Sequence, residues 1–308
     1  MTKRNLPITT SDLLEFLELD SSFAFEMKVR ELFASRRLRY HHGGTYDDPH
    51  TGLPRQFDLR VDLNCSLPHV RTRVFLAIEC KALSEFAPML VYRSPRSAYE
   101  AGHQVIAQTC GEREKIIGLL NHHMRTPLWN EREGEFPSIC TLEIAANRSQ
   151  YRSGDFVGKS VDVVSRDGSG TKFKSGDAEV YGRWTQALQS AASLLGKLNG
   201  EYNSDQKIEF TWIVPILVVP DQRLFVVDYD DSAVRSCDPY EIDRTPFFID
   251  YKPPIFECDG PTFKFGHFEI MTYAGLKDFV VNITGDDSRH FLDLQIGEQA
   301  CFEALSRF

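Results

Sequence analysis

The sequence predicts an α/β protein with a mixed central sheet flanked by helices, and three patterns lead to this prediction. Residues 21–37 carry apolar side chains at helical spacing, and residues 178–198 do the same. In 55–63 ("RQFDLRVDL") apolar and polar residues alternate, which is the period of a strand with one polar face. The run 74–82 ("VFLAIECKA") begins with five consecutive apolar residues, as expected for a central strand covered on both faces.

The remaining patterns complete the expected order of elements. Residues 208–220 and 223–230 are two apolar runs, and we expect them to pair as neighbouring strands across a turn at 220–222. The pattern between 83 and 177 is mixed. Further elements are predicted there and at the two ends: helices at 11–19, 97–120 and 298–308, a strand at 138–146 and a loop at 165–176.

The composition excludes several classes of protein. A chain of 308 residues with 42% hydrophobic and 26% charged residues is typical of a globular protein and unlike a disordered one. Its apolar runs fall short of the roughly 18 residues that a spanning helix needs, and acids occupy the first twenty residues. We therefore expect a cytoplasmic protein without a membrane partner. The seven cysteines form no CxxC pair, which argues against a disulfide framework and a structural zinc site.

The net charge of −9 gives the chain no general attraction to nucleic acid. A polyanionic partner would have to be held by a local basic patch. Three stretches are candidates for such a patch, at 35–42 ("SRRLRYHH"), 71–73 ("RTR") and 92–96 ("YRSPR"). Each of them taken alone is equally consistent with a solvated helix end or turn.

Acidic and basic side chains gather where the two predicted strands end. Side chains two residues apart on a strand share a face, so Glu79 and Lys81 project together and Cys80 points the other way. Asp58 joins them if the two strands pair, as their short connection favours. Two carboxylates and the Cys80 backbone carbonyl form an all-oxygen site that suits Mg²⁺ or Mn²⁺. A lysine beside such an ion suits hydrolysis of a phosphodiester bond.

These residues give the chain a resemblance to a known family. Glu26 on a first helix, Asp58 in "RQFDLRVDL" and Glu79-Cys80-Lys81 in "VFLAIECKA" resemble the motif of the PD-(D/E)XK, or restriction-endonuclease-like, nuclease superfamily. The resemblance implies one domain over 1–308 with an α-β-β-β-α-β core. That core would comprise 21–82 and 178–230, with a large insertion at 83–177 and a C-terminal extension at 231–308.

The resemblance also implies a role for each matching residue. Asp58, Glu79 and the Cys80 carbonyl would hold the metal, Lys81 would activate water, and Glu26 would assist through a water on the metal. Glu31 competes with Glu26 for that role, and Gln186 or Gln189 could add a polar group from the second helix. The chain departs from the family where Gln56 and Phe57, and no proline, precede the aspartate.

The function implied is that of a Mg²⁺-dependent endodeoxyribonuclease, the effector of a bacterial restriction or anti-phage defence system. The motif does not distinguish DNA from RNA or an endonuclease from an exonuclease. Because the chain is acidic, we expect a homodimer or a partner ATPase or helicase to deliver the substrate. Two alternatives remain: an inactive nuclease fold serving as a nucleic-acid-binding or scaffold subunit, and a nucleotide-binding regulator that uses 154–160 ("GDFVGKS").

Overall fold

A computed structural model of the chain describes residues 7–19, 21–66, 70–108, 139–144, 146, 149–176, 178–198, 208–254 and 263–284. Its helices are α1 (Thr10–Leu19), α2 (Ser22–Ser35), α4 (Ala178–Leu198) and α5 (Tyr273–Thr284). Its strands are β1 (Arg39–Asp47), β2 (Pro54–Ser66), β3 (Val70–Cys80), β4 (Met89–Pro95), β5 (His103–Gln108), β6 (Ile139–Ile144), β7 (Phe156–Arg166), β8 (Phe173–Gly176), β9 (Ile208–Val219), β10 (Leu224–Asp228), β11 (Tyr240–Glu241), β12 (Arg244–Tyr251) and β13 (Phe265–Thr272).

All of these strands belong to one mixed sheet, which confirms the predicted α/β class. The strand order is β1-β2-β3-β9-β13-β12-β7-β4-β10-β11, while β5 pairs with β9 and β6, and β8 pairs with β7. The first three strands form an antiparallel meander, and β3 runs parallel to β9, as does β13. Among the described helices, none is long and apolar enough to cross a membrane.

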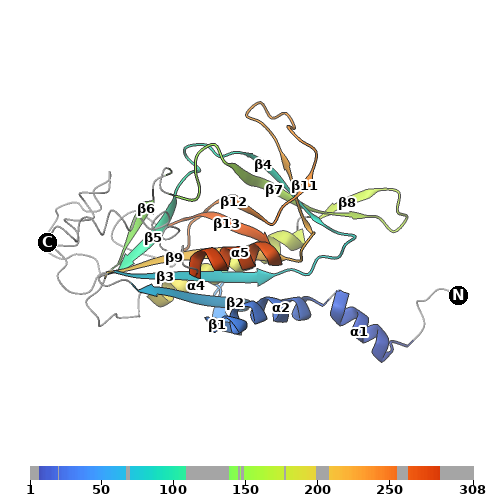
Figure 1. The fold of residues 1–308 in the computed structure, drawn as a ribbon, viewed down its shortest axis with the longest axis horizontal. Coiled ribbons are helices and arrows are strands. Elements are labelled where there is room, and N and C mark those ends of the chain that lie inside the picture. The colour runs from blue at the N-terminus through green and yellow to red at the C-terminus, as the bar shows by residue number, and fades with distance from the viewer. Residues whose placement is uncertain are drawn as a thin grey trace.

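Helices cover both faces of the sheet around β3 and β9. The even-numbered β3 residues, such as Leu76 and Ile78, belong to one hydrophobic cluster together with residues of α2 and α5. The odd-numbered residues Phe75 and Ala77 belong to a second cluster with residues of α4. Figure 1 shows α5 lying across the near side of these strands and α2 beside β1 and β2 at the lower edge of the molecule. The near-continuous apolar run of β3 is thus explained by burial on both faces.

The helix α2 begins after a serine N-cap, Ser21. The Ser21 hydroxyl accepts a hydrogen bond from the Ala24 backbone N–H at 3.2 Å, which satisfies one of the donors left open in a first helical turn. Along the chain, α2 is followed by β1, β2 and β3, and α4 by β9. The strand β1 was not indicated by the alternation pattern alone.

The segments expected to be peripheral are part of the same sheet. Residues 83–177 contribute β4 to β8, and β13 from the C-terminal part lies between β9 and β12. In Figure 1 the strands β12 and β13 continue the layer formed by β3 and β9. Residues 231–284 therefore supply strands to the centre of the sheet as well as the helix α5. The helix predicted at 298–308 lies outside the described residues.

Two predictions of local structure are wrong. The helix predicted at 97–120 is replaced at 103–108 by β5, and its remainder from 109 onward lies outside the described residues. β5 pairs with β6 on one side and β9 on the other, so sheet hydrogen bonds outweigh the helical propensity of this short segment. The segment predicted as a loop at 165–176 includes the end of β7 and all of β8, which form a hairpin.

The expected pairing of 208–220 with 223–230 is also wrong, although both segments are strands. β9 pairs with β3, β13 and β5, whereas β10 pairs with β4 and β11. The reason is that both edges of β9 are already occupied by other strands. The turn between them, where Gln222 adopts a positive φ of 63°, therefore leads the chain to another part of the sheet.

If α5 is an integral part of the core, then Phe279→Ala should destabilise the protein strongly. The Phe279 side chain is 1% exposed and lies 6.3 Å, ring to ring, from Trp212 of β9. Loss of a buried phenylalanine side chain costs about 3–5 kcal/mol of unfolding free energy. Val281→Ala, on the exposed side of the same helix, should change it by less than about 0.5 kcal/mol. Urea unfolding of both variants checks this, and equal effects would contradict it.

Candidate functional site

The strands β2 and β3 bring Asp58 and Glu79 to the same place. The antiparallel register pairs Leu59 with Ile78 and Arg60 with Ala77, so the next pair along the ladder is Asp58 with Glu79. Side chains that lie directly opposite each other on one face of such a ladder have Cβ atoms about 4.5–5.5 Å apart. The two predicted carboxylates therefore follow directly after the last ladder pair, Leu59 with Ile78, at one end of the meander.

A hydrogen bond holds the Asp58 carboxylate against the backbone of β3. Its Oδ2 atom accepts a hydrogen bond from the Cys80 N–H at 2.8 Å. The bond fixes Asp58 beside the middle residue of Glu79-Cys80-Lys81, whose carbonyl is the predicted third metal ligand. The other carboxylate oxygen, Oδ1, makes no hydrogen bond with a described residue and remains available to a ligand.

Glu79 and Lys81 are buried on the side of the sheet that α4 covers. Glu79 follows Ala77 by two residues, and Ala77 packs in the α4 cluster. The Lys81 N–H donates to the Val218 carbonyl of β9 at 2.9 Å, so the strand geometry continues through Lys81. The exposed fractions are 0% for Glu79 and 8% for Lys81. Cys80 points to the opposite side and packs in the α2 and α5 cluster.

Arg60 and Tyr46 surround Glu79, and the sequence reasoning assigned no role to either of them. Burial lowers the pKa of Arg60 to about 10, and the negative charge of Glu79 opposes that change. Burial, followed by the charge of Glu79, raises the pKa of Tyr46. Both residues are therefore electrostatic neighbours of Glu79. The only signal in the sequence was the place of Arg60 on the polar side of the alternating run 55–63.

The helix α4 is fastened over this part of the sheet by hydrogen bonds to β1 and β2. The Tyr46 hydroxyl donates to the Gln186 carbonyl at 3.2 Å, and the Gln186 side-chain amide donates to the Gln56 carbonyl at 2.7 Å. Gln186 thus binds the backbone two residues before Asp58. Gln189, the other glutamine considered from the sequence, is half-buried on the same helix. The polar groups of α4 consequently position β2, the strand that carries Asp58.

Glu26 lies in the layer of α2 and is paired with a histidine. Its Oε1 atom is 2.7 Å from Nε2 of His42, a β1 residue that lies opposite Leu59 in the sheet. Leu59 belongs to the α2 and α5 cluster, whereas Glu79 faces α4. Glu31, the competing acid of this helix, is exposed. The structure therefore binds Asp58 to the Cys80 N–H, between Glu79 and Lys81 in the chain, and places Glu26 in a separate pair with His42.

The donor atoms at this site fit a hard divalent cation. Asp58, Glu79 and the Cys80 carbonyl offer oxygen atoms only, which are the ligands that Mg²⁺ and Mn²⁺ prefer in proteins. Within the described parts of the chain, no three or more His, Cys, Asp or Glu side chains are arranged to hold one ion. A cation here would accordingly have two side-chain ligands and complete its shell with the backbone carbonyl and water.

The glycine-rich segment 154–160 has no phosphate-binding geometry. Residues 156–160 lie in β7, where Gly158 pairs with Arg93 of β4. A Cβ atom at Gly158 would lie 2.6 Å from the Phe247 ring, so the glycine permits close packing of β12. Lys159 forms an ion pair with Glu100. The segment thus serves the sheet, and the alternative of a nucleotide-binding loop here has no structural support.

Comparison with family models, with curated proteins and with solved structures yields no match for this chain. The resemblance to the nuclease superfamily therefore depends on the motif residues and on the order and pairing of the elements that carry them.

Proposed function

We propose that the chain is a metal-dependent nuclease that hydrolyses phosphodiester bonds of DNA. The observation that carries the proposal is the Asp58–Glu79 pair at the end of the β2–β3 ladder, with Asp58 hydrogen-bonded to the Cys80 N–H and Lys81 on the same strand. A surface ion pair would not need a fully buried glutamate. Burial of an acid is costly unless a cation or hydrogen bonds compensate it, which favours a functional role.

The chain's own residues can perform several parts of such a reaction. Asp58 and Glu79 would hold Mg²⁺ or Mn²⁺, and a bound ion supplies neutralisation of phosphate charge and a water of lowered pKa. Lys81 places an ammonium group in a nearly water-free position, where it can orient a proton and offset charge that develops on phosphorus. Arg60 balances the charge of Glu79 from the neighbouring strand. Together these groups suit the attack of water on a phosphodiester.

The remaining parts of the proposal concern how substrate reaches the site. The net charge of −9 gives no long-range attraction to a duplex, so delivery by a partner ATPase or helicase, or by a second copy of the chain, is part of the proposal. We also propose that the protein is the effector of a restriction or anti-phage defence system, and this part of the proposal is based on the resemblance alone. RNA is the alternative substrate, since both nucleic acids carry the same scissile group.

Mg²⁺ or Mn²⁺ should raise the unfolding temperature of the purified protein. An ion that binds only the folded state stabilises it by about 2.7 kcal/mol at 100 times its dissociation constant. Asp58→Asn and Glu79→Gln should lose most of this shift because each removes one ligand charge. Asp231→Asn, which alters an exposed acid, should retain it. Thermal melts with each cation and with EDTA measure the shift, and an unchanged shift in both site variants would place the cation elsewhere.

The wild-type protein should degrade plasmid DNA in the presence of Mg²⁺, and Lys81→Met should reduce the rate by about 10²–10⁴-fold. Methionine keeps most of the buried volume and removes the charge. Lys172→Ala, at an exposed turn, serves as the control for loss of one positive charge. Gel assays at matched folding, checked by circular dichroism, give the comparison. Equal rates for Lys81→Met and wild type would refute the role of Lys81.

A wild-type protein that binds DNA with either cation but never cuts it would favour the scaffold alternative.

A further inference from the structure

Two of the basic stretches noted in the sequence meet at one cavity beside the candidate site. The cavity has a volume of about 320 Å³ and lies between the meander β1–β2–β3 and the C-terminal half of α4. Arg39 and His41 reach it from the stretch 35–42, and Arg73 from the stretch 71–73. Arg60 of β2 also lines it, two residues along the strand from Asp58. Because a strand rises about 3.4 Å per residue, Arg60 in the cavity wall lies roughly 7 Å along β2 from Asp58.

The charges of the cavity wall are only partly balanced. Arg73 is paired with Asp62 in a two-pronged contact at 3.1 and 3.0 Å, and it also lies 3.5 Å from Glu209. Arg39 lies 3.6 Å from the same Asp62, with 66% of its side chain exposed. Asp62 is the one carboxylate that lines the cavity, against three arginines. Three guanidinium groups thus line the cavity, and the largely exposed Arg39 has room to contact an added anion.

Arg60 has no carboxylate within 4 Å among the described residues, although it is only 3% exposed. Its Nε atom donates to the Ser190 hydroxyl and its Nη2 atom to the Ser190 carbonyl, both at 3.0 Å, and Nη2 also donates to the Ser193 hydroxyl at 2.5 Å. Nη1 has no hydrogen-bond partner in the described part of the chain. Glu79 offsets part of this charge, and the buried Nη1 atom retains a hydrogen bond that a ligand oxygen could accept.

Apolar and aromatic groups form the rest of the wall. The Phe57 ring lies 4.1 Å from the Arg60 guanidinium carbon, and the Phe75 ring lies 4.4 Å from that of Arg73. Leu194 and Leu198 of α4 complete the apolar part. A ligand that suits this wall has a charged end for the arginines and a flat or apolar body. The volume is at the lower end of the range for small-molecule pockets, which suits one nucleotide and excludes a duplex.

We propose that this cavity binds one phosphate-bearing nucleotide unit, with its phosphate on Arg39, Arg60 and Arg73 and its base against the aromatic and leucine side chains. The inference deepens the proposed nuclease function, because a nucleotide held here lies directly next to the bond cut at Asp58 and Glu79. The same chemistry is offered by a free mononucleotide and by the phosphorylated end of a strand.

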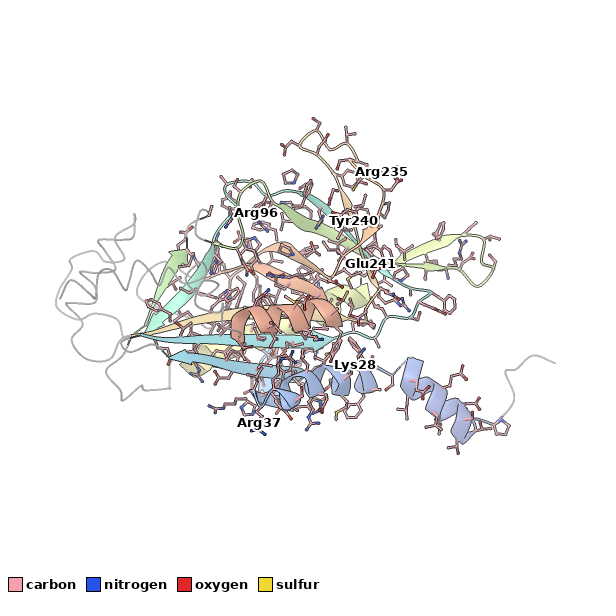
Figure 2. The ribbon with its side chains drawn as sticks, in the orientation of Figure 1. Lys28, Arg37, Arg96, Arg235, Tyr240 and Glu241 are labelled. Carbon is pink, nitrogen blue, oxygen red and sulfur yellow. The ribbon has the colours of Figure 1, made fainter. Side chains whose placement is uncertain are left out.

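The test is calorimetric binding in EDTA, so that no cation or cleavage is involved. Thymidine 5′-monophosphate should bind to the wild-type protein and thymidine about tenfold more weakly or not at all. Arg39→Met should weaken binding of the monophosphate about tenfold, and its exposed side chain makes loss of folding improbable. Arg235→Met is the matched control, since Arg235 is exposed and Figure 2 places it on the opposite side of the molecule from Arg37, close to β1.

Arg60 requires two variants because it also fastens α4. Arg60→Lys keeps the charge, Arg60→Met removes it, and both lose the bond pattern to Ser190. At equal folded fractions, Arg60→Met should bind the monophosphate more weakly than Arg60→Lys. Equal affinity of wild type, Arg39→Met and both Arg60 variants, or absence of binding to the wild type, would overturn the inference.

The source of the phosphate follows from a competition experiment. Two short thymidine oligonucleotides, one with a 5′-phosphate and one with a 5′-hydroxyl, compete with the monophosphate. Displacement by the 5′-phosphorylated form alone assigns the cavity to a strand end. Displacement by neither form assigns it to a free nucleotide, and both results uphold the proposed chemistry. Asp58→Asn should bind the monophosphate normally. If the wild-type protein binds the monophosphate but does not cleave DNA, only the nuclease proposal fails. If it cleaves DNA but does not bind the monophosphate, only this inference fails.

Discussion

The register of the β2–β3 ladder is the constraint on which the candidate site depends. The pairing of Leu59 with Ile78 sets Asp58 opposite Glu79 and places Arg60 and Asp62 on the side of α4. A slip of one residue would turn every one of these side chains to the other face, where Leu59 and Val61 now fill the core. Only one register buries the apolar faces of both strands. These faces therefore specify where the charged groups lie.

Buried charge is the second feature that organises this region. The polar side of β2 does not face solvent, since Arg60 and Asp62 lie beneath α4. Arg60 meets this helix through Ser190, and Arg73 meets Asp62 and Glu209, so arginines link three strands and a helix. The arrangement joins the oxygen-rich end of the ladder to a cavity lined by three arginines. A polyanion cut at the end of the ladder and held in the cavity would be recognised at both places, even though the whole chain is acidic.

Sequence reasoning succeeded where a pattern is local and long. The helices α2 and α4 and the strands β2 and β3 follow from patterns over nine or more residues. It failed at 103–108, because a six-residue segment adopts the structure that its neighbours β6 and β9 impose. It also failed for the partner of β9, since no local signal tells that β3 and β13 already occupy the edges of that strand.

By itself the sequence determined that Glu79 and Lys81 share a face at the end of a buried strand, because the period of a strand is a property of its backbone. It also indicated that Asp58 belongs to the neighbouring strand. Only the tertiary structure decided that Asp58 is bound to the Cys80 N–H, that Glu26 is bound to His42, and that Arg39, Arg60 and Arg73 surround one cavity. These contacts join residues that are far apart in the chain, and the packing of α2 and α4 against the sheet selects them.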